Sequence, residues 1–251
     1  MSDDGPLRGR IALVTGAASG IGRATAMRLG AQGASVGCLD RDGDGAAVVA
    51  HAIATAGGRA VAVAADVSDP AAVAAGVDRL GAELGRPSIL VNNAGIPGGG
   101  RFMDVTFEDW RRVLDVHVDG AFHVTQAVLP AMTEAGWGRI VNICSEAVWL
   151  GNQSVQYVTA KAALVGFTRA LAYQLAPSGI LVNGVAPGPV DTPMLRDNDP
   201  AAIEAELASV RIGRFLEPDE IAATIAFLVG PGGDGYVGQV LSPNGGTVFI
   251  G

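Results

Sequence analysis

Residues 11–22 read IALVTGAASGIG, four apolar residues followed by a glycine-rich turn. The apolar run is too short for a helix and predicts a buried strand, and the pattern that begins at about residue 21 predicts a helix. The same alternation continues through the chain. Further strands are predicted at Ser35–Leu39, Ala60–Val63, Ile89–Val91, Ile140–Ile143 and Ile180–Asn183. Apolar strands that alternate with helices form a parallel sheet covered on both faces, so we expect an α/β fold with a doubly wound parallel β-sheet.

The segments between these runs predict helices and a single domain. Helical patterns lie at about residues 21–32, 44–56, 70–84, 108–135 and 155–176. Start signals precede two of them, Ser68-Asp69-Pro70 before the third and Thr106 with Asp109 before the fourth. No linker, repeat or low-complexity stretch divides the chain, so we expect one domain over residues 1–251.

A polar, acidic stretch at 191–214 interrupts this rhythm and has helical character near 201–210. In a doubly wound fold, an excursion after a C-terminal strand end lies over the ligand crevice. The stretch is therefore a candidate substrate lid, and a plain surface insertion is the alternative.

Composition and charge exclude several classes of protein. Of the 251 residues, 49% are hydrophobic and 17% are charged, which is the opposite of a disordered composition. The net charge is −8 and no run of Lys or Arg occurs, so we expect no nucleic-acid partner, because phosphate binding needs a positive surface. No long apolar stretch is free of polar or glycine breaks, so we expect no membrane span.

The cysteines and histidines predict neither a disulfide framework nor a metal site. Cys38 and Cys144 lie in apolar, strand-like runs, and we expect buried reduced thiols in a cytoplasmic protein. His117 and His123 are six residues apart, which places them on different faces of a helix and argues against a shared metal ion.

The glycine-rich turn after the first strand has the spacing G-x-x-x-G-x-G. Glycines at such a turn let the backbone approach a pyrophosphate, which then lies at the helix N-terminus. The turn residues expected to bind a dinucleotide are Gly16, Ser19, Gly20, Ile21 and Gly22.

Asp40 ends the second strand, twenty residues after Gly20. A carboxylate at that place accepts hydrogen bonds from the adenosine ribose and repels a 2′-phosphate. We therefore expect NAD as the cofactor and regard NADP as the less favoured one, although Arg41 follows at once. The alternative for Asp40 is a strand-end acid that only begins a turn.

Tyr157 and Lys161 are four residues apart on a predicted helix and hence on one face, and Ser145 lies twelve residues upstream of Tyr157. A neighbouring lysine and a positively charged nicotinamide would lower the pKa of the tyrosine from about 10 towards working pH. Such a phenol acts as a general base on an alcohol or as an acid on a carbonyl. Ser145 would donate a hydrogen bond to the same substrate oxygen.

Taken together, these residues resemble the short-chain dehydrogenase/reductase family, in its single-domain branch of about 250 residues, over nearly the whole chain. The matching pieces are Thr15–Gly22, Asp66-Val67, Asn92–Gly95, Ser145, Tyr157-x-x-x-Lys161, Asn183 and Pro187–Thr192. The resemblance implies a Rossmann-type doubly wound sheet and further cofactor-binding residues. Those implied residues are Asp66 and Val67 at the adenine, Asn93, Ala94 and Gly95 along the cofactor, Lys161 with Tyr157 at the nicotinamide ribose, and Pro187, Gly188, Val190 and Thr192 at the nicotinamide.

Two features depart from the family pattern. His117 occupies a place where the family commonly has an asparagine, whose backbone carbonyl holds a water in a proton relay. Our hypothesis is that His117 keeps this water site and also passes protons, since imidazole titrates near neutral pH; a packed neutral histidine is the alternative. The spacing between Ser145 and Tyr157 is one residue shorter than the commonest one, so the substrate does not follow from the family.

The sequence thus predicts an NAD-dependent oxidoreductase that interconverts a secondary alcohol and a ketone through Ser145, Tyr157, Lys161 and His117. The alternative enzyme is a 3-oxoacyl-(acyl-carrier-protein) reductase that uses NADPH, and a remote alternative is a catalytically silent nucleotide-binding protein. The expected partners are a small-molecule alcohol or ketone and copies of the same chain. The C-terminal stretch Gly238–Gly246 is similar to a family segment that packs at a tetramer interface, so a homotetramer (or a homodimer) is expected.

Overall fold

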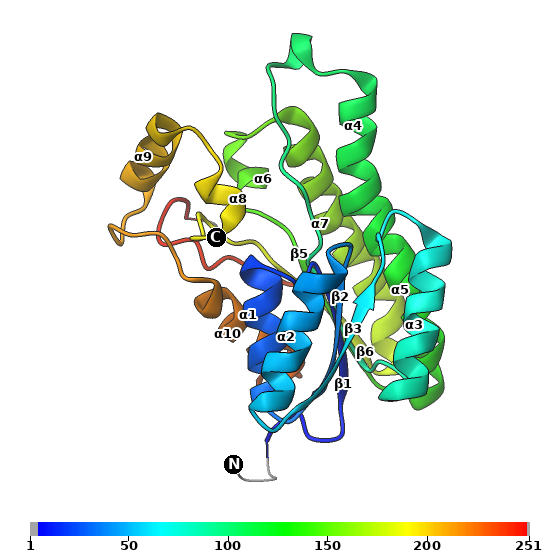
Figure 1. Ribbon diagram of the computed structural model, residues 1–251. Coiled ribbons are helices and arrows are strands. Elements are labelled where there is room, and N and C mark those ends of the chain that lie inside the picture. The colour runs from blue at the N-terminus through cyan, green and yellow to red at the C-terminus, as the bar shows by residue number, and fades with distance from the viewer. Residues whose placement is uncertain (1–4, 250–251) are drawn as a thin grey trace.

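The computed structural model describes residues 5–249, so the ends of the predicted domain, residues 1–4 and 250–251, lie outside the described part. Its centre is a seven-stranded sheet in the order β3-β2-β1-β4-β5-β6-β7, and Figure 1 shows helices on either side of it. Every pair of neighbouring strands is parallel. The strands are β1 (Ile11–Thr15), β2 (Ser35–Asp40), β3 (Arg59–Ala64), β4 (Ile89–Asn92), β5 (Gly138–Ile143), β6 (Ile180–Val185) and β7 (Val240–Leu241). The predicted Rossmann-type parallel sheet is confirmed.

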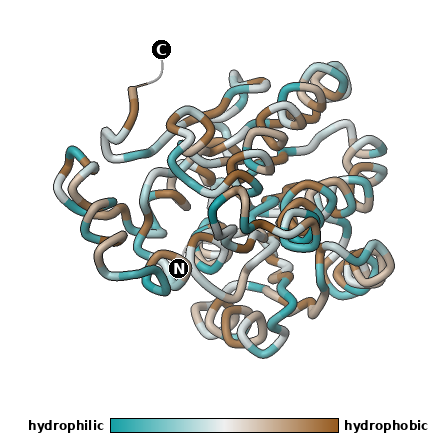
Figure 2. Tube along the Cα trace, turned by 90° about the horizontal axis from the view of Figure 1, so that it is seen from above, coloured by the Kyte–Doolittle hydropathy of each residue, from teal (hydrophilic) through white to brown (hydrophobic). Residues whose placement is uncertain are grey.

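Helices cover both faces of this sheet, as the near-continuous burial of its strands requires. The helices are α1 (Gly20–Ala31), α2 (Gly43–Thr55), α3 (Pro70–Glu83), α4 (Phe107–Leu114), α5 (Gly120–Ala135), α6 (Ala147–Leu150), α7 (Val155–Leu175), α8 (Pro193–Arg196), α9 (Pro200–Ser209) and α10 (Pro218–Val229). One apolar core lies under α1, α2 and α10, and a second lies under α3, α5 and α7. Hydrophobic and hydrophilic residues alternate along the helical coils in Figure 2, as they do in helices with one buried face.

The predicted helix starts are confirmed at atomic detail. The Asp69 carboxylate accepts the backbone N–H groups of Ala71 and Ala72 at the start of α3, with Pro70 as the first helical residue. The Thr106 hydroxyl accepts the N–H of Asp109 over 3.0 Å at the start of α4. These side chains satisfy donors that the helix itself leaves without partners.

The structure differs from the prediction between residues 108 and 135. The segment predicted as one helix consists of α4, a π-helical turn η2 (Asp115–Asp119) and α5. A π turn inserts one extra residue into the helical ladder, a change that apolar spacing does not reveal. The turn places His117 in the protein interior, where it is buried.

The candidate lid, residues 191–214, contains α8 and α9, so the helical character predicted near 201–210 is confirmed. The next helix, α10, was not predicted, although it begins with a capping box between Glu217 and Glu220. α10 packs against α1 and completes one of the two cores. Within residues 5–249, no helix is long and apolar enough to cross a membrane.

Candidate active site

A cavity of about 500 Å³ opens at the carboxyl ends of the strands. β1 and β4 are neighbours at the centre of the strand order, and ligands of doubly wound folds bind in the crevice where the order reverses in this way. The cavity brings together nearly all of the predicted site residues. Those that line it are Gly16, Ser19, Gly20, Ile21, Asp40, Asp66, Val67, Asn93, Ala94, Gly95, His117, Ser145, Tyr157, Lys161, Pro187, Gly188, Val190 and Thr192.

The glycine-rich turn leaves backbone donors facing this cavity. Gly16 and Gly20 have φ values of +64° and +51°, a region that side chains rarely allow. The residue before α1, Ser19, makes no side-chain capping hydrogen bond, so the first N–H groups of this twelve-residue helix have no side-chain cap. An array of such N–H groups at a helix N-terminus binds phosphate.

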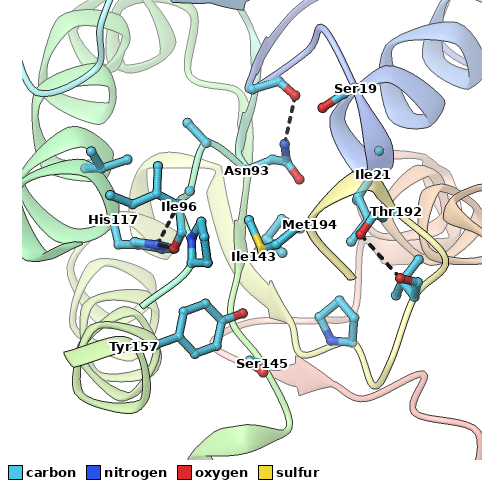
Figure 3. A pocket seen from close by; sticks show the side chains of 18 of the residues that line it. Ser19, Ile21, Asn93, Ile96, His117, Ile143, Ser145, Tyr157, Thr192 and Met194 are labelled. Atoms are coloured by element: carbon cyan, nitrogen blue, oxygen red, sulfur yellow. Dashed lines mark hydrogen bonds between the residues drawn. The ribbon is translucent and has the colours of Figure 1, made fainter. Parts of the chain in front are cut away.

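Gly22 has a different position from the one predicted for it. It is absent from the cavity lining within the described residues, and a Cβ built on it would lie 2.0 Å from the carbonyl oxygen of Gly16. Asn93 completes this packing because its Nδ2 donates to the backbone oxygens of Thr15 and Gly16 over 2.9 and 3.2 Å; Figure 3 shows one hydrogen bond of the Asn93 side chain as a dashed line. Gly22 therefore supports the shape of the turn.

Two carboxylates at the other end of the turn are held by the backbone. Asp40 Oδ2 accepts the N–H of Ala18 and its Oδ1 accepts the N–H of Asp42, over 2.9 and 3.0 Å. The Asp66 carboxylate accepts the N–H and the hydroxyl of Ser68, and these bonds lower the pKa of Asp66. The Asp40 carboxylate thus has a fixed place at the end of β2, with Arg41 also lining the cavity.

Tyr157, Lys161 and Ser145 meet at the centre of the cavity. Ser145 follows β5, and the Tyr157 hydroxyl points from α7 towards it (Figure 3). Lys161 lies one turn further along α7; its Nζ donates to the carbonyl oxygen of Ile143 over 2.7 Å and lies 5.6 Å from the centroid of the Tyr157 ring.

The pKa of Tyr157 is raised, because enclosure by the protein penalises the phenolate, while a hydrogen bond with Ser145 works against the rise. This direction is opposite to the one expected from the sequence. Burial lowers the pKa of Lys161 to about 8, so the lysine is a weaker positive neighbour than an exposed one. A positive charge beside the phenol, such as that of an oxidised nicotinamide, lowers the pKa of Tyr157. The pKa falls below its ordinary value only if this lowering exceeds the rise caused by burial.

His117 lies beside Tyr157, with the two rings edge to face and their centroids 5.6 Å apart. Its Nε2 lies 3.0 Å from the nitrogen and 2.9 Å from the oxygen of Ile96 (Figure 3). Its Nδ1 is buried and has no hydrogen-bond partner in the described chain. Burial and the nearby Lys161 lower the pKa of His117 to about 3, so the imidazole is neutral at ordinary pH.

The far end of the cavity comes from α6, α8, α9 and the loop before α7. Glu146, Asn152, Gln153, Met194 and Glu206 line it. The aromatic side chains of Trp149 and Phe102 are 40% and 72% exposed and are not among its lining residues. The position of Glu206 gave no signal in the sequence beyond its place in the candidate lid.

The residues present fit a nicotinamide dinucleotide. The uncapped N-terminus of α1 suits the pyrophosphate. Gly20 and Thr192 face each other so closely that a Cβ on Gly20 would lie 3.2 Å from the Thr192 methyl group. A Cβ on Gly188 would lie 2.6 Å from the backbone oxygen of Asn244. The backbone therefore forms a narrow cradle that continues to the Ser145, Tyr157 and Lys161 group.

Comparisons with known proteins agree with this geometry. A family model described as short chain dehydrogenase matches residues 10–202. A 3-oxoacyl-(acyl-carrier-protein) reductase of Pseudomonas aeruginosa is 39% identical over 96% of this chain and 98% of its own length. A cis-4-hydroxycyclohexanecarboxylate dehydrogenase of Sinomonas cyclohexanicum is 43% identical over 96% of this chain and 97% of its own length.

Solved structures show the same similarity. A short chain dehydrogenase from Burkholderia cenocepacia in complex with NADP superposes with a TM-score of 0.90 at 39% identity, over 96% of this chain and 99% of that one. A 3-ketoacyl-(acyl-carrier-protein) reductase from Brucella melitensis complexed with NADH has a TM-score of 0.90 at 35% identity, over 97% of this chain and 100% of that one. These two proteins hold different dinucleotides, so they do not support the expected preference for NAD. The fold, the cavity and these similarities together establish that the chain is an oxidoreductase of the short-chain dehydrogenase/reductase family.

Proposed function

We propose that this protein interconverts a ketone and a secondary alcohol by hydride transfer with NAD(P), and that the ketone is a 3-oxoacyl group. The observation that supports the reaction is the meeting of Ser145, Tyr157 and Lys161 in a cavity suited to a dinucleotide. The 3-oxoacyl group is favoured by the names of relatives, among them the reductases of Pseudomonas aeruginosa and Brucella melitensis. This substrate was the alternative from the sequence, and it replaces an unspecified secondary alcohol.

When bound, the nicotinamide supplies or accepts the hydride. Tyr157 gives its phenolic proton to the substrate oxygen during reduction and takes it back during oxidation. Ser145 donates a hydrogen bond to the same oxygen and stabilises the charge that develops there. Lys161 is held by the Ile143 carbonyl and places its positive charge beside the Tyr157 ring, which favours the phenolate form of Tyr157.

The cofactor would extend from Asp40 to Ser145 across the cavity. We assign the N-terminal turn of α1 to the pyrophosphate, Asp66 and Val67 to the adenine, and the segment 187–192 to the nicotinamide. The carboxylate of Asp40 supports NAD over NADP in this proposal, because a 2′-phosphate beside it would be repelled.

His117 acts, in this proposal, as a positioning residue. Its Nδ1 and the Oδ1 of Asn92 are both buried without a hydrogen-bond partner in the described chain, and both residues line one small cavity. The volume of that cavity, about 10 Å³, is close to the space one water needs. This supports a water site held by the imidazole. The low pKa of His117 argues against the predicted proton transfer by a cationic imidazole.

The candidate lid contributes side chains to the cavity. Met194, Leu195, Asn198 and Glu206 of the candidate lid line the cavity, which supports a substrate-covering role for 191–214. We also propose a homotetramer, or a homodimer, in which the β7 edge of the sheet pairs with another copy. Both outer strands, β3 and β7, have a neighbouring strand on one side only. We choose β7 because it belongs to the stretch Gly238–Gly246, which resembles a family segment that packs at a tetramer interface.

A second candidate substrate, a secondary alcohol without an acyl group that is oxidised with NAD, is favoured by Asp40. The relative from Sinomonas cyclohexanicum, whose name specifies a hydroxycyclohexanecarboxylate, is an example of such an activity in the family.

One assay distinguishes these possibilities. The protein is mixed with NADH or NADPH and a 3-oxoacyl thioester, and separately with NAD or NADP and a panel of secondary alcohols, and nicotinamide absorbance is followed. We expect the thioester to be reduced faster than any alcohol is oxidised. Faster oxidation of an alcohol with NAD would favour the second candidate. Dinucleotide binding without turnover of any substrate would favour a catalytically silent protein.

A further inference from the structure

Two glutamates occupy the substrate end of the cavity, beyond the catalytic group. Glu146 directly follows Ser145 and is only 7% exposed. The Thr247 hydroxyl donates to its Oε2, and in the described chain no group donates to its Oε1. Glu206 reaches the same cavity from α9, and is half-buried. Two acids that are 60 residues apart in the chain thus share one wall of the site.

No positive side chain of the described residues is paired with either glutamate. The cavity contains Lys161, whose Nζ is bound to the Ile143 carbonyl, and Arg41, which lies beside Asp40 at the adenosine end. Burial raises the pKa of both glutamates, and the charge of Glu206 raises the pKa values of Glu146 and Tyr157 further. Glu206 is therefore near enough to act on both the Glu146 carboxylate and the catalytic phenol.

We propose that Glu146 and Glu206 determine specificity, by favouring substrates that carry a positive charge or hydrogen-bond donors beyond the reacting carbonyl and by disfavouring substrates that carry a carboxylate there. A partly buried carboxylate without a positively charged partner is costly, and a substrate cation offsets that cost. A substrate carboxylate would instead add a third negative charge to the same wall. The inference rests on the proposed function, because it concerns the same cavity.

Three esters of 3-oxobutanoic acid test the preference. The 2-(dimethylamino)ethyl ester carries an ammonium at pH 7, the 3-methylbutyl ester has the same shape without charge, and the 3-carboxypropyl ester carries an anion. We expect kcat/KM for the ammonium ester to exceed that for the neutral ester about tenfold, and the carboxylate ester to fall about tenfold below it.

Binding provides a readout that does not need turnover. The corresponding 3-hydroxybutanoate esters are titrated calorimetrically into protein saturated with NADH, a complex that does not react. We expect the same ranking of affinities. If the neutral 3-oxo ester reacts and the ammonium ester gains nothing in rate or affinity, the specificity proposal is wrong and the proposed reaction stands. If no ester reacts while the ammonium ester binds best, the reaction is wrong and the specificity proposal stands.

Substitutions that remove a charge but keep the shape of the side chain test whether the two glutamates cause the preference for the ammonium ester. Glu206→Gln and Glu146→Gln are each expected to bring the ammonium-to-neutral ratio down towards one. Glu204→Gln is the matched control, because Glu204 lies exposed on the same helix and does not line the cavity; its ratio should equal that of the unmodified protein. An unchanged ratio in both cavity variants would overturn the assignment.

Discussion

The Tyr157 hydroxyl and the Ser145 side chain face the same point of the cavity from different elements. Replacing Tyr157 by Phe removes the proton donor while keeping the ring in place. We expect kcat to fall at least about a hundredfold, the lower range for a lost general acid, with NADH affinity changed less than about twofold. Stopped-flow rates and fluorescence titration with NADH measure the two quantities.

The control for this variant is Tyr173→Phe. Tyr173 is on the same helix but 87% exposed, so its loss of a hydroxyl should leave both quantities unchanged. A Tyr157→Phe protein with full activity would disprove the assigned acid.

Asp40 is the residue that supports the choice between the two dinucleotides. Asp40→Asn removes the charge and keeps one acceptor oxygen, so one of the two hydrogen bonds from the backbone N–H groups of Ala18 and Asp42 is retained and the other is lost. We expect the ratio of kcat/KM values for NADH and NADPH to shift about tenfold towards NADPH, because repulsion of the 2′-phosphate is relieved. Asp44→Asn, an exposed acid in the first turn of α2, is the control, and an unchanged ratio in Asp40→Asn would refute the ribose contact.

The stability of the folded protein at acid pH tests whether His117 is buried as a neutral imidazole. Its pKa is about 3 in the folded protein and about 6.5 when unfolded, so between these values the unfolded state binds more protons. The free energy of unfolding must therefore fall as pH decreases from 6.5 towards 3, by at most about 1.4 kcal/mol per pH unit from this group. Urea unfolding at several pH values measures the slope.

The His117→Asn variant should show a shallower loss of stability over this pH range, whatever its absolute stability. The same substitution at His51, an exposed residue of α2, should leave the slope unchanged. A slope that is equal in the His117→Asn and unmodified proteins would mean that the imidazole is protonated in the folded state.

At the scale of the secondary-structure elements, glycines in two helices have opposite roles. A Cβ at Gly22 of α1 would lie 2.0 Å from the Gly16 carbonyl oxygen, whereas a Cβ at Gly166 of α7 would meet nothing within 4 Å. Gly166→Ala should raise the free energy of unfolding by about 1 kcal/mol through helix propensity. Gly22→Ala should lower it by about 1–3 kcal/mol through overpacking, and should weaken NADH binding because the turn must shift. Equal effects of the two substitutions would contradict this account.

The first six strands and most helices could be predicted because each follows from local apolar spacing and start residues, whereas β7, with two residues, is too short to give such a signal. The π turn could not, because its extra residue is stabilised by contacts between elements, such as the bond between His117 and Ile96. Gly98 shows the same limit. It approaches Ser154 so closely that a Cβ would lie 2.1 Å from the hydroxyl oxygen, so this glycine belongs to a packed loop, which local sequence does not reveal.

At the scale of the whole molecule, the positions of the chain segments explain why the site residues could be predicted from the sequence and the substrate could not. The predicted cofactor-binding residues and Ser145 follow the strand ends, and parallel strands bring those ends to one edge of the sheet, where Tyr157 and Lys161 join them from α7. The substrate wall combines Glu146 after β5 with Glu206 of α9, and Thr247, from a third segment, donates a hydrogen bond to Glu146. No periodicity in the sequence relates three segments of that kind, so only the folded arrangement brings them together.

The assembly can be tested at the β7 edge of the sheet. At the edge of the sheet, β7 has two residues and a strand on one side only, and Val237 just before it is 38% exposed. Light scattering during size-exclusion chromatography should give about four times, or for a dimer twice, the chain mass of 25.3 kDa. Val237→Lys should shift this mass downwards at micromolar concentration, because a charge at an edge opposes pairing between copies. Val48→Lys, at an exposed position of α2 far along the sheet from β7, should not. A mass of one chain for the unmodified protein would disprove the assembly, and an unaltered oligomer in Val237→Lys would place the interface on another surface.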